Sequence, residues 1–487
     1  MTTLQEFPEE ILLEIFKLFQ LPFDVEQTLL PSKTQRPLEN LLSIALCSKK
    51  FFRVVRPILY RTIYLRNIAE RHYFIRSLCE HPGLGHYVRH LQMNEVPVTC
   101  KNVHPSAKVQ KSFRVLKRGL ELPLGIKQTI SRGLANGLVS AEIALVLLLV
   151  PNLQELGLQL PVDSVAISKI FGMATQGTSS TQNQPVSYSD EAAAATRLFS
   201  TGHFSKLRVV RLLSSFQNFG NVNVPMLPRV LQLPNLQALY YRDLQWMGDP
   251  LQNISKVYKL THLNLNVTEM RIKDLTHLIS QSPQLRALTL TFNVGKHGES
   301  SMSRKVLQDL GNLLRKDALP HLEDLHISGN FRGVAGQDYH IGSLRGLKNL
   351  KSLRVSPVDL VGKRVHKIKK DSVHPMVSHD GLPLMDLHAA LPTSLEYISF
   401  KVIRLRSSHE TQYALHQVVN LMTKESRSSL CHLRVDSEMD GHIGWNRTRG
   451  RTWSLEGAGI GFPKISSLLK RAVGQDWLVK VNSIVDA

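Results

Sequence analysis

Residue types that carry out catalysis are present in this chain, but none of them stands in the spacing that a known catalytic motif requires. A phosphate-binding loop needs a second glycine and a Ser or Thr around its Gly-Lys pair, and both Gly295-Lys296 and Gly362-Lys363 lack them. The glycine cluster at 457–461 misses the spacing of a dinucleotide-binding fingerprint. Neither a His-Glu-x-x-His zinc motif nor a Gly-x-Ser-x-Gly nucleophile elbow occurs. The sequence therefore predicts no enzyme and no cofactor.

Histidines and cysteines could also bind a metal ion or react as thiols. His86 and His90 are four residues apart, but they lie on an extended-looking segment without a nearby carboxylate, so we expect no metal site there. The cysteines form no Cys-x-x-Cys pair, which predicts neither a zinc site nor a disulfide framework; they are Cys47, Cys79, Cys100 and Cys431. Spacing alone leaves a ubiquitin-transferring cysteine open, although none of the four lies in the basic, exposed surroundings that make a thiol reactive. Cys47 lies in an apolar helical stretch, and we expect it to be a small core residue.

The amino-terminal part of the chain contains three apolar segments, at 7–18, 38–52 and 57–65, and the first predicts a short helix that begins after Pro8. Two neighbouring faces of this helix are apolar; one holds Ile11, Ile15 and Leu18, and the other holds Leu12, Phe16 and Phe19. A helix that is apolar over most of its circumference needs burial on more than one side. A module of about 60 residues has too small a core to bury that much surface. The pattern therefore predicts a partner chain that covers the remaining apolar face.

The order of these residues resembles the F-box family. Its pattern is Leu-Pro-x-Glu-Ile-Leu-x-x-Ile-Phe, a short link, a Leu-Leu pair followed by a cysteine and a phenylalanine, and often a closing Leu-Tyr. The matching residues are Pro8, Glu10, Ile11, Leu12, Ile15 and Phe16, then Leu41, Leu42, Cys47 and Phe51, then Leu59 and Tyr60. The chain departs from the pattern where Phe7 replaces leucine and where residues 20–37, with three prolines, make a longer link, which we expect to be a surface loop.

The resemblance implies a substrate-recognition subunit of an SCF-type (Skp–cullin–F-box) ubiquitin ligase. The F-box-like module would dock on a Skp-type adaptor, and through it on a cullin. The docking residues that the resemblance implies are Pro8, Ile11, Leu12, Ile15, Leu41, Leu42, Cys47 and Phe51. Catalysis would reside in other subunits, and this chain would hold a protein substrate close to the charged carrier enzyme.

A Leu-x-x-Leu-x-Leu phrase recurs after this module and predicts a strand at each copy. Its copies begin at Leu153, Leu207, Leu236, Leu260, Leu285, Leu322 and Leu350, with looser copies at 88–93, 395–400 and 430–435. From Leu207 to Leu350 the copies are 24 to 37 residues apart, and leucine-rich repeats recur about every 20–29 residues. Segments 272–279 and 303–314 have the helical spacing expected of return helices. The resemblance to F-box proteins with leucine-rich repeats implies an α/β fold, a small helical F-box followed by an irregular horseshoe solenoid; scattered amphipathic α/β units are the alternative.

These segments predict four parts of the chain. Residues 1–66 form the F-box-like helical module with its inserted loop at 20–37, and residues 67–150 form a mixed linking region. Residues 151–436 form the repeat region, with mobile insertions near 175–190 and 361–380. Residues 437–487 form a carboxy-terminal capping segment, with a helix expected at 462–471.

The residues that flank the strand leucines predict a substrate-binding face that is polar, partly basic and aromatic. They are Arg211, Tyr240, His262, Asn264, Thr289, Asp324, His326, Arg354, Tyr397 and Arg434. Arg211, Arg354 and Arg434 stand at equivalent positions of their repeats, and arginine forks bind carboxylate and phosphate groups. We therefore expect an acidic or phosphorylated protein segment as the target.

The net charge of +21, with a pI near 9.9, leaves other partners open. Basic clusters occur at 101–118, 363–370 and 447–451, but the sequence does not show that they share one face, as nucleic-acid binding requires. We expect a solvated surface, or a nuclear-import signal at 363–370, rather than a nucleic-acid site. The acidic amino terminus and the lack of an apolar run of about 20 residues predict no secretory signal and no membrane span, hence a cytoplasmic or nuclear protein. A scaffold without a degradative role and a basic nucleic-acid-associated protein stay as alternative functions.

Overall fold

The computed structural model describes residues 4–19, 35–94, 122–161, 164–176, 204–214, 226–246, 251, 257–292, 305–315, 319–329, 340–361, 387–402, 421, 429–437, 441–447 and 453–458. The predicted insertions at 175–190 and 361–380, the basic runs at 101–118 and 363–370, and the predicted helix at 462–471 lie wholly or largely outside these residues. The chain divides into two compact units, Met1–Tyr240 and Tyr241–Ala487, which are described one at a time.

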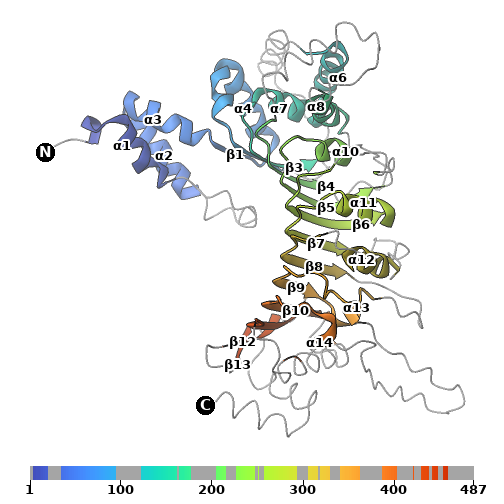
Figure 1. The fold of residues 1–487 in the computed structure, drawn as a ribbon. Helices are drawn as coiled ribbons and strands as arrows, with labels where there is room; N and C mark the ends of the chain where they lie inside the picture. Colours follow the sequence, from blue (N-terminus) through green and yellow to red (C-terminus); the bar gives the residue numbers. More distant parts are fainter. Residues whose placement is uncertain are drawn as a thin grey trace, which may run out of the picture. The chain divides into compact units, whose positions relative to one another are not determined.

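Three helices form the amino-terminal module of the first unit (Figure 1). They are α1 (Glu9–Lys17), which follows the 3-10 turn η1 (Leu4–Glu6), α2 (Gln35–Cys47) and α3 (Lys49–Leu59). Pro8 precedes α1, and two acidic side chains in the first turn, Glu9 and Glu10, favour the positive end of the helix dipole. Ser48 alone separates α2 from α3, and its hydroxyl accepts a hydrogen bond of 3.1 Å from the Phe51 amide, which caps α3.

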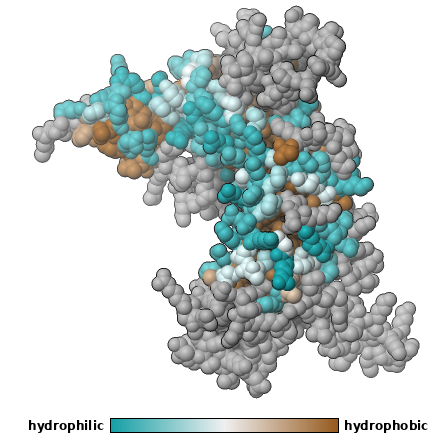
Figure 2. Space-filling model, viewed as in Figure 1, coloured by the Kyte–Doolittle hydropathy of each residue, from teal (hydrophilic) through white to brown (hydrophobic). Residues whose placement is uncertain are grey.

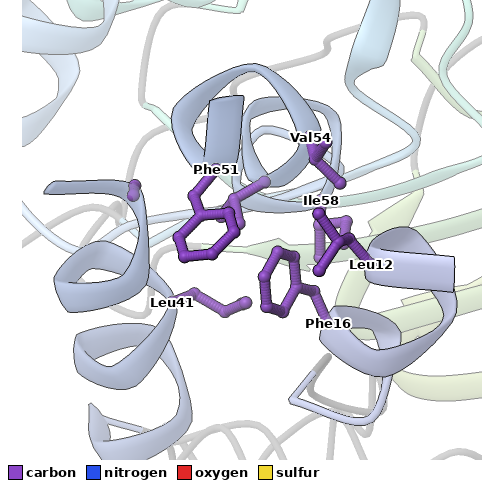
Figure 3. Packing of buried hydrophobic residues seen from close by; sticks show 8 residues of the cluster. Leu12, Phe16, Leu41, Phe51, Val54 and Ile58 are labelled. Carbon is purple, nitrogen blue, oxygen red and sulfur yellow. The ribbon is translucent and has the colours of Figure 1, made fainter. Parts of the chain in front are cut away.

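The three helices share one apolar core (Figure 3). Leu12 and Phe16 enter it from α1, Leu41 from α2, and Phe51 and Ile58 from α3. The rings of Phe16 and Phe51 meet edge to face, with centroids 5.6 Å apart and an interplanar angle of 81°. Edge-to-face packing of this kind adds about 1 kcal/mol beyond the buried area, so these two rings hold α1 against α3.

Parallel strands make up the rest of the first unit. Its strands are β1 (Thr62–Leu65), β2 (His90–Met93), β3 (Glu155–Leu160) and β4 (Val209–Ser214), and β5 (Ala238–Trp246) crosses the boundary between the units. Its helices are α4 (Ile68–Glu80), η3 (Pro82–Tyr87), α6 (Leu124–Ala135), α7 (Val139–Leu149), α8 (Val165–Gln176) and α10 (Met226–Leu231). Each of β1, β2 and β3 pairs in parallel with the next strand along the chain.

The second unit continues the same pattern of strand and return. Its strands are β6 (His262–Met270), β7 (Ala287–Phe292), β8 (Asp324–Gly329), β9 (Ser352–Val355), β10 (Tyr397–Val402), β11 (His432–Ser437), β12 (Gly441–Arg447) and β13 (Trp453–Ala458). Its helices are α11 (Ile272–Ser280), α12 (Lys305–Arg315), α13 (Pro357–Val361) and α14 (Leu387–Ala390). Strands β6 to β11 are parallel, and β12 and β13 continue the sheet antiparallel. In Figure 1, α11, α12 and α13 lie on the same side of these strands.

The Leu-x-Leu phrases form the strands at the predicted places, and the predicted return helices are α11 and α12. Along β7 and β8 the leucines and isoleucine are buried while the residues between them stay partly accessible, as alternation across a sheet requires. The asparagine before a phrase has a role of its own. The Asn235 side chain donates to the carbonyl of Ser205 and the Asn349 side chain to that of Pro320, both at 2.6 Å. Each asparagine thereby ties its strand to the preceding one.

The predicted fold class, a small helical F-box followed by a leucine-rich-repeat solenoid, is wrong. The chain is an α/β protein built on an open sheet that runs parallel through β11, and not a horseshoe solenoid. A regular solenoid stacks similar repeats of about 20–45 residues, each in contact with its neighbours. Here residues 271–286 connect β6 to β7, whereas residues 161–208 connect β3 to β4 and residues 356–396 connect β9 to β10. The leucine phrase determines where strands form, but such unequal returns do not make a regular repeat.

Candidate protein-interaction surfaces

The amino-terminal module leaves a large apolar surface uncovered. Among the described residues eleven large hydrophobic side chains are exposed, and seven of them belong to this module: Leu4, Phe7, Ile11, Leu18, Leu42, Leu46 and Phe52. Figure 2 shows hydrophobic residues, in brown, gathered over this module on the viewed face. Isolated exposed hydrophobic residues are normal, but a concentration of this kind marks an interaction site. We call these seven residues the apolar face.

The helices of the module split their apolar residues between the core and the apolar face. In α1, Leu12 is fully buried, whereas Ile11 is 46% exposed. In α2, Leu41 lies in the core, whereas Leu42 is 48% exposed and Leu46 is 87% exposed. The same alternation puts Phe51 inside and Phe52 outside. The second apolar side of these helices is therefore not needed for their own packing.

The eight residues predicted to dock the adaptor fall into three groups. Pro8, Ile11, Leu42 and Cys47 are exposed, Ile15 is half-buried, and Leu12, Leu41 and Phe51 are buried in the core. Cys47 was expected in the core, and that expectation is wrong: it is exposed, with its thiol 3.2 Å from the carbonyl oxygen of Ser43. Sequence reasoning missed Leu46 and Phe52, although Leu46 stands one helical turn after Leu42.

Basic side chains accompany the apolar face on α3. Lys49 and Arg53 are exposed, and Arg53 forms an ion pair with Glu9 at the start of α1. The ammonium of Lys50 donates to the carbonyl of Phe7 at 2.8 Å. These contacts fix the start of α1 against α3, so the exposed Phe7 and Ile11 stand on an anchored segment.

A second candidate surface lies on the strands of the first unit. The Glu155 carboxylate on β3 contacts Arg211 Nη1 on β4 at 3.0 Å and His90 Nδ1 on β2 at 3.5 Å, and the Arg211 guanidinium lies 4.9 Å from the centre of the Tyr240 ring. Burial raises the pKa of the Glu155 carboxyl, but the hydrogen bonds and charges of His90 and Arg211 outweigh it and hold that pKa below its usual value. His90 therefore has a carboxylate beside it, which its own stretch of sequence did not show.

The eight remaining residues predicted to bind substrate lie on strands of the second unit, in two rows of the sheet. One row holds Asn264, Thr289, His326, Arg354 and Arg434, with Ser399 between the last two. The next row holds His262, Asp324 and Tyr397. In order from β6 to β11, this row reads His262, Ala287, Asp324, Ser352, Tyr397 and His432. His262, Asp324 and Arg354 are exposed, and the other five are half-buried. The register therefore brings these eight residues onto one face of the unit, while Arg211 and Tyr240 belong to the other unit.

A buried charge cluster inside the first unit is structural. Arg71 Nε lies 2.8 Å from one oxygen of Glu142, and His72 Nε2 lies 2.9 Å from the other. Arg71 and Glu142 are both buried, so they compensate each other's desolvation and tie α4 to α7.

The described residues contain no group of His, Cys, Asp and Glu that could hold a metal ion. Within the same part of the chain, no helix has both the length and the apolar character that crossing a membrane requires. A scan against protein-family models and a search of the curated proteins found no match for this chain.

Proposed function

We propose that this chain is the substrate-recognition subunit of an SCF-type ubiquitin ligase. Its amino-terminal module would dock on a Skp-type adaptor, and its strand faces would bind the protein to be ubiquitinated. The proposal combines the F-box-like order of residues with one structural observation, the apolar face of the module.

The apolar face supports this reading because the module does not need it to fold. Leu12, Phe16 and Phe51 belong to the buried core, whereas Ile11, Leu42 and Leu46 lie outside it and are exposed. Exposed leucines of this kind lower solubility unless a partner covers them. A few apolar anchors at the centre of an interface contribute about 2 kcal/mol or more each.

In this proposal the chain binds the substrate, and another subunit of the ligase carries out catalysis. The polar strand faces offer arginine, histidine and tyrosine side chains to a target. A subunit that only brings substrate to a separate catalytic centre needs no more than this.

The test is co-purification of tagged full-length chain, as wild type and as Ile11→Asp plus Leu42→Asp, with a Skp-type adaptor and a cullin probed by antibody. We expect the variant to lose both while it keeps proteins that bind the strand faces. Adaptor retention by the variant would refute the docking assignment. Stabilisation of the retained partners when the proteasome is inhibited separates a ligase subunit from a scaffold.

A further inference from the structure

We infer that the strand face around Arg354 is a binding site for an acidic peptide segment, with Arg354 as the fork that binds a carboxylate. The inference rests on the proposed function, because it names the class of target that the strand faces of the second unit would hold.

Arg354 has the exposure and the aromatic neighbour that are expected of a binding residue. It is exposed on β9, and its guanidinium lies 5.5 Å from the centre of the Tyr397 ring on β10. Stacking on a tyrosine uses the flat face of the guanidinium and leaves the N–H groups along its edge available. Among the described residues no carboxylate forms an ion pair with Arg354.

The first unit shows what such an arginine binds. Arg211 also stacks on a tyrosine, Tyr240, and there its edge is occupied by the carboxylate of Glu155 at 3.0 Å. Glu155 stands on the preceding strand, opposite the residue two positions before Arg211. The stacked arginine at Arg211 is therefore satisfied by a carboxylate from the chain itself.

The position equivalent to Glu155 in the second unit is held by Asp324. Asp324 on β8 lies opposite Ser352, two positions before Arg354. Aspartate is one methylene shorter than glutamate, and no ion pair joins Asp324 to Arg354. The N–H groups along the edge of the Arg354 guanidinium can therefore bind a carboxylate of a separate peptide.

The surroundings of Arg354 favour an anion. His326 and Arg434 stand in the same row of the sheet, on β8 and β11, and His432 lies beside Tyr397 with ring centroids 6.4 Å apart. Asp324 is the one acidic side chain in these two rows from β6 to β11 among the described residues, and it opposes an anionic ligand. Neighbouring strands are about 4.8 Å apart, so Arg434 adds a positive charge about 10 Å from Arg354.

The test measures anisotropy of a fluorescein-labelled Gly/Ser peptide that carries glutamates, with a glutamine-substituted peptide as the neutral probe, against the full-length chain. Wild type should bind the glutamate peptide at least about tenfold tighter. Arg354→Leu should remove this preference. Asp324→Glu should also remove it, because the added methylene lets the chain's own carboxylate occupy Arg354, whereas Asp324→Asn should bind at least as tightly as wild type.

Equal binding of the two peptides by wild type would overturn the inference, and so would an unchanged preference in both Arg354→Leu and Asp324→Glu. In a competition experiment, oligo-dT and unlabelled glutamate peptide are each used to displace the labelled glutamate peptide. If oligo-dT does so at the lower concentration, the site binds nucleic acid and the inference is overturned. The same preparations are tested for adaptor binding. Adaptor binding without peptide preference refutes this inference alone, and peptide preference without adaptor binding refutes the proposed function alone.

Discussion

Ile11 and Leu12 are neighbours in α1, but Leu12 lies in the three-helix core whereas almost half of the Ile11 side chain is open to solvent. The two residues therefore separate folding of the module from binding by the module. Both belong to the motif that resembles the F-box, and the motif alone does not distinguish their roles.

We predict that Ile11→Asp changes the free energy of unfolding by no more than about 0.5 kcal/mol, as is usual for surface substitutions. Leu12→Asp buries an unpaired charge among Phe16, Val54 and Ile58 and should unfold the module. Hydrogen exchange of the α1 and α3 amides measures both effects. Equal loss of protection in the two variants would contradict the assignment of Ile11 to the surface.

Glu155 predicts a pH dependence of stability in the first unit. Because the folded state holds the pKa of Glu155 below its usual value near 4.5, this carboxylate stabilises the fold above pH 4.5. The contribution disappears as the pH falls through the lower, folded-state pKa. Glu155→Gln should therefore cost about 1–2 kcal/mol at neutral pH and progressively less below pH 4.5. Urea unfolding of both proteins across this range measures it, and a cost that is independent of pH would contradict it.

Tyr258 carries a buried hydroxyl that has no hydrogen-bond partner among the described residues. Tyr258→Phe removes this uncompensated group, and we expect the variant to be equally stable or up to about 1 kcal/mol more stable. Burial also raises the pKa of Tyr258 from 10.0 to about 12. Wild type should consequently lose stability as the pH rises from 10 toward 12, and Tyr258→Phe should lose less. Thermal melts at neutral and alkaline pH compare the two, with a less stable variant at neutral pH as the contrary result.

Gly311 and Gly157 both lack room for a Cβ atom, but the obstacle is backbone at Gly311 and a side chain at Gly157. A Cβ at Gly311 would stand 1.9 Å from the backbone oxygen of Ile341, whereas at Gly157 it would stand 1.6 Å from the end of the Gln92 side chain. A side chain can rotate away more easily than a backbone can move. We expect Gly311→Ala to cost about 1–3 kcal/mol and Gly157→Ala less. Combining Gly157→Ala with Gln92→Ser should restore stability in chemical denaturation, and failure of this rescue would argue against the contact.

The sequence predicted elements well where the signal is local. The Pro8 start of α1 and the Leu-x-Leu strands follow from short-range patterns, and the structure confirms them. The two apolar faces of α1 were also visible, but which face turns inward depends on Leu41 and Phe51, which lie far along the chain.

The sequence failed where distance along the chain hides a contact. Glu155 contacts His90 because β2 and β3 pair, and the residues next to His90 in the sequence did not indicate this carboxylate. Cys47 was expected in the core, but its place at the end of α2 leaves it exposed. The solenoid prediction failed for a related reason, since the repeated phrase carries no information about the unequal returns between strands.

The apolar face is tested most directly by the affinity of purified full-length chain for a purified Skp-type adaptor. The decisive comparison is between wild type, the double variant Leu42→Asp plus Leu46→Asp, and the control Leu124→Asp. Leu124 lies on α6 and is 61% exposed, between Leu42 at 48% and Leu46 at 87%. The account predicts tight binding by wild type and the control, and an increase in Kd of at least about 30-fold for the double variant, the equivalent of one lost anchor. Absence of adaptor binding by wild type, or equal affinity in all three proteins, would contradict it.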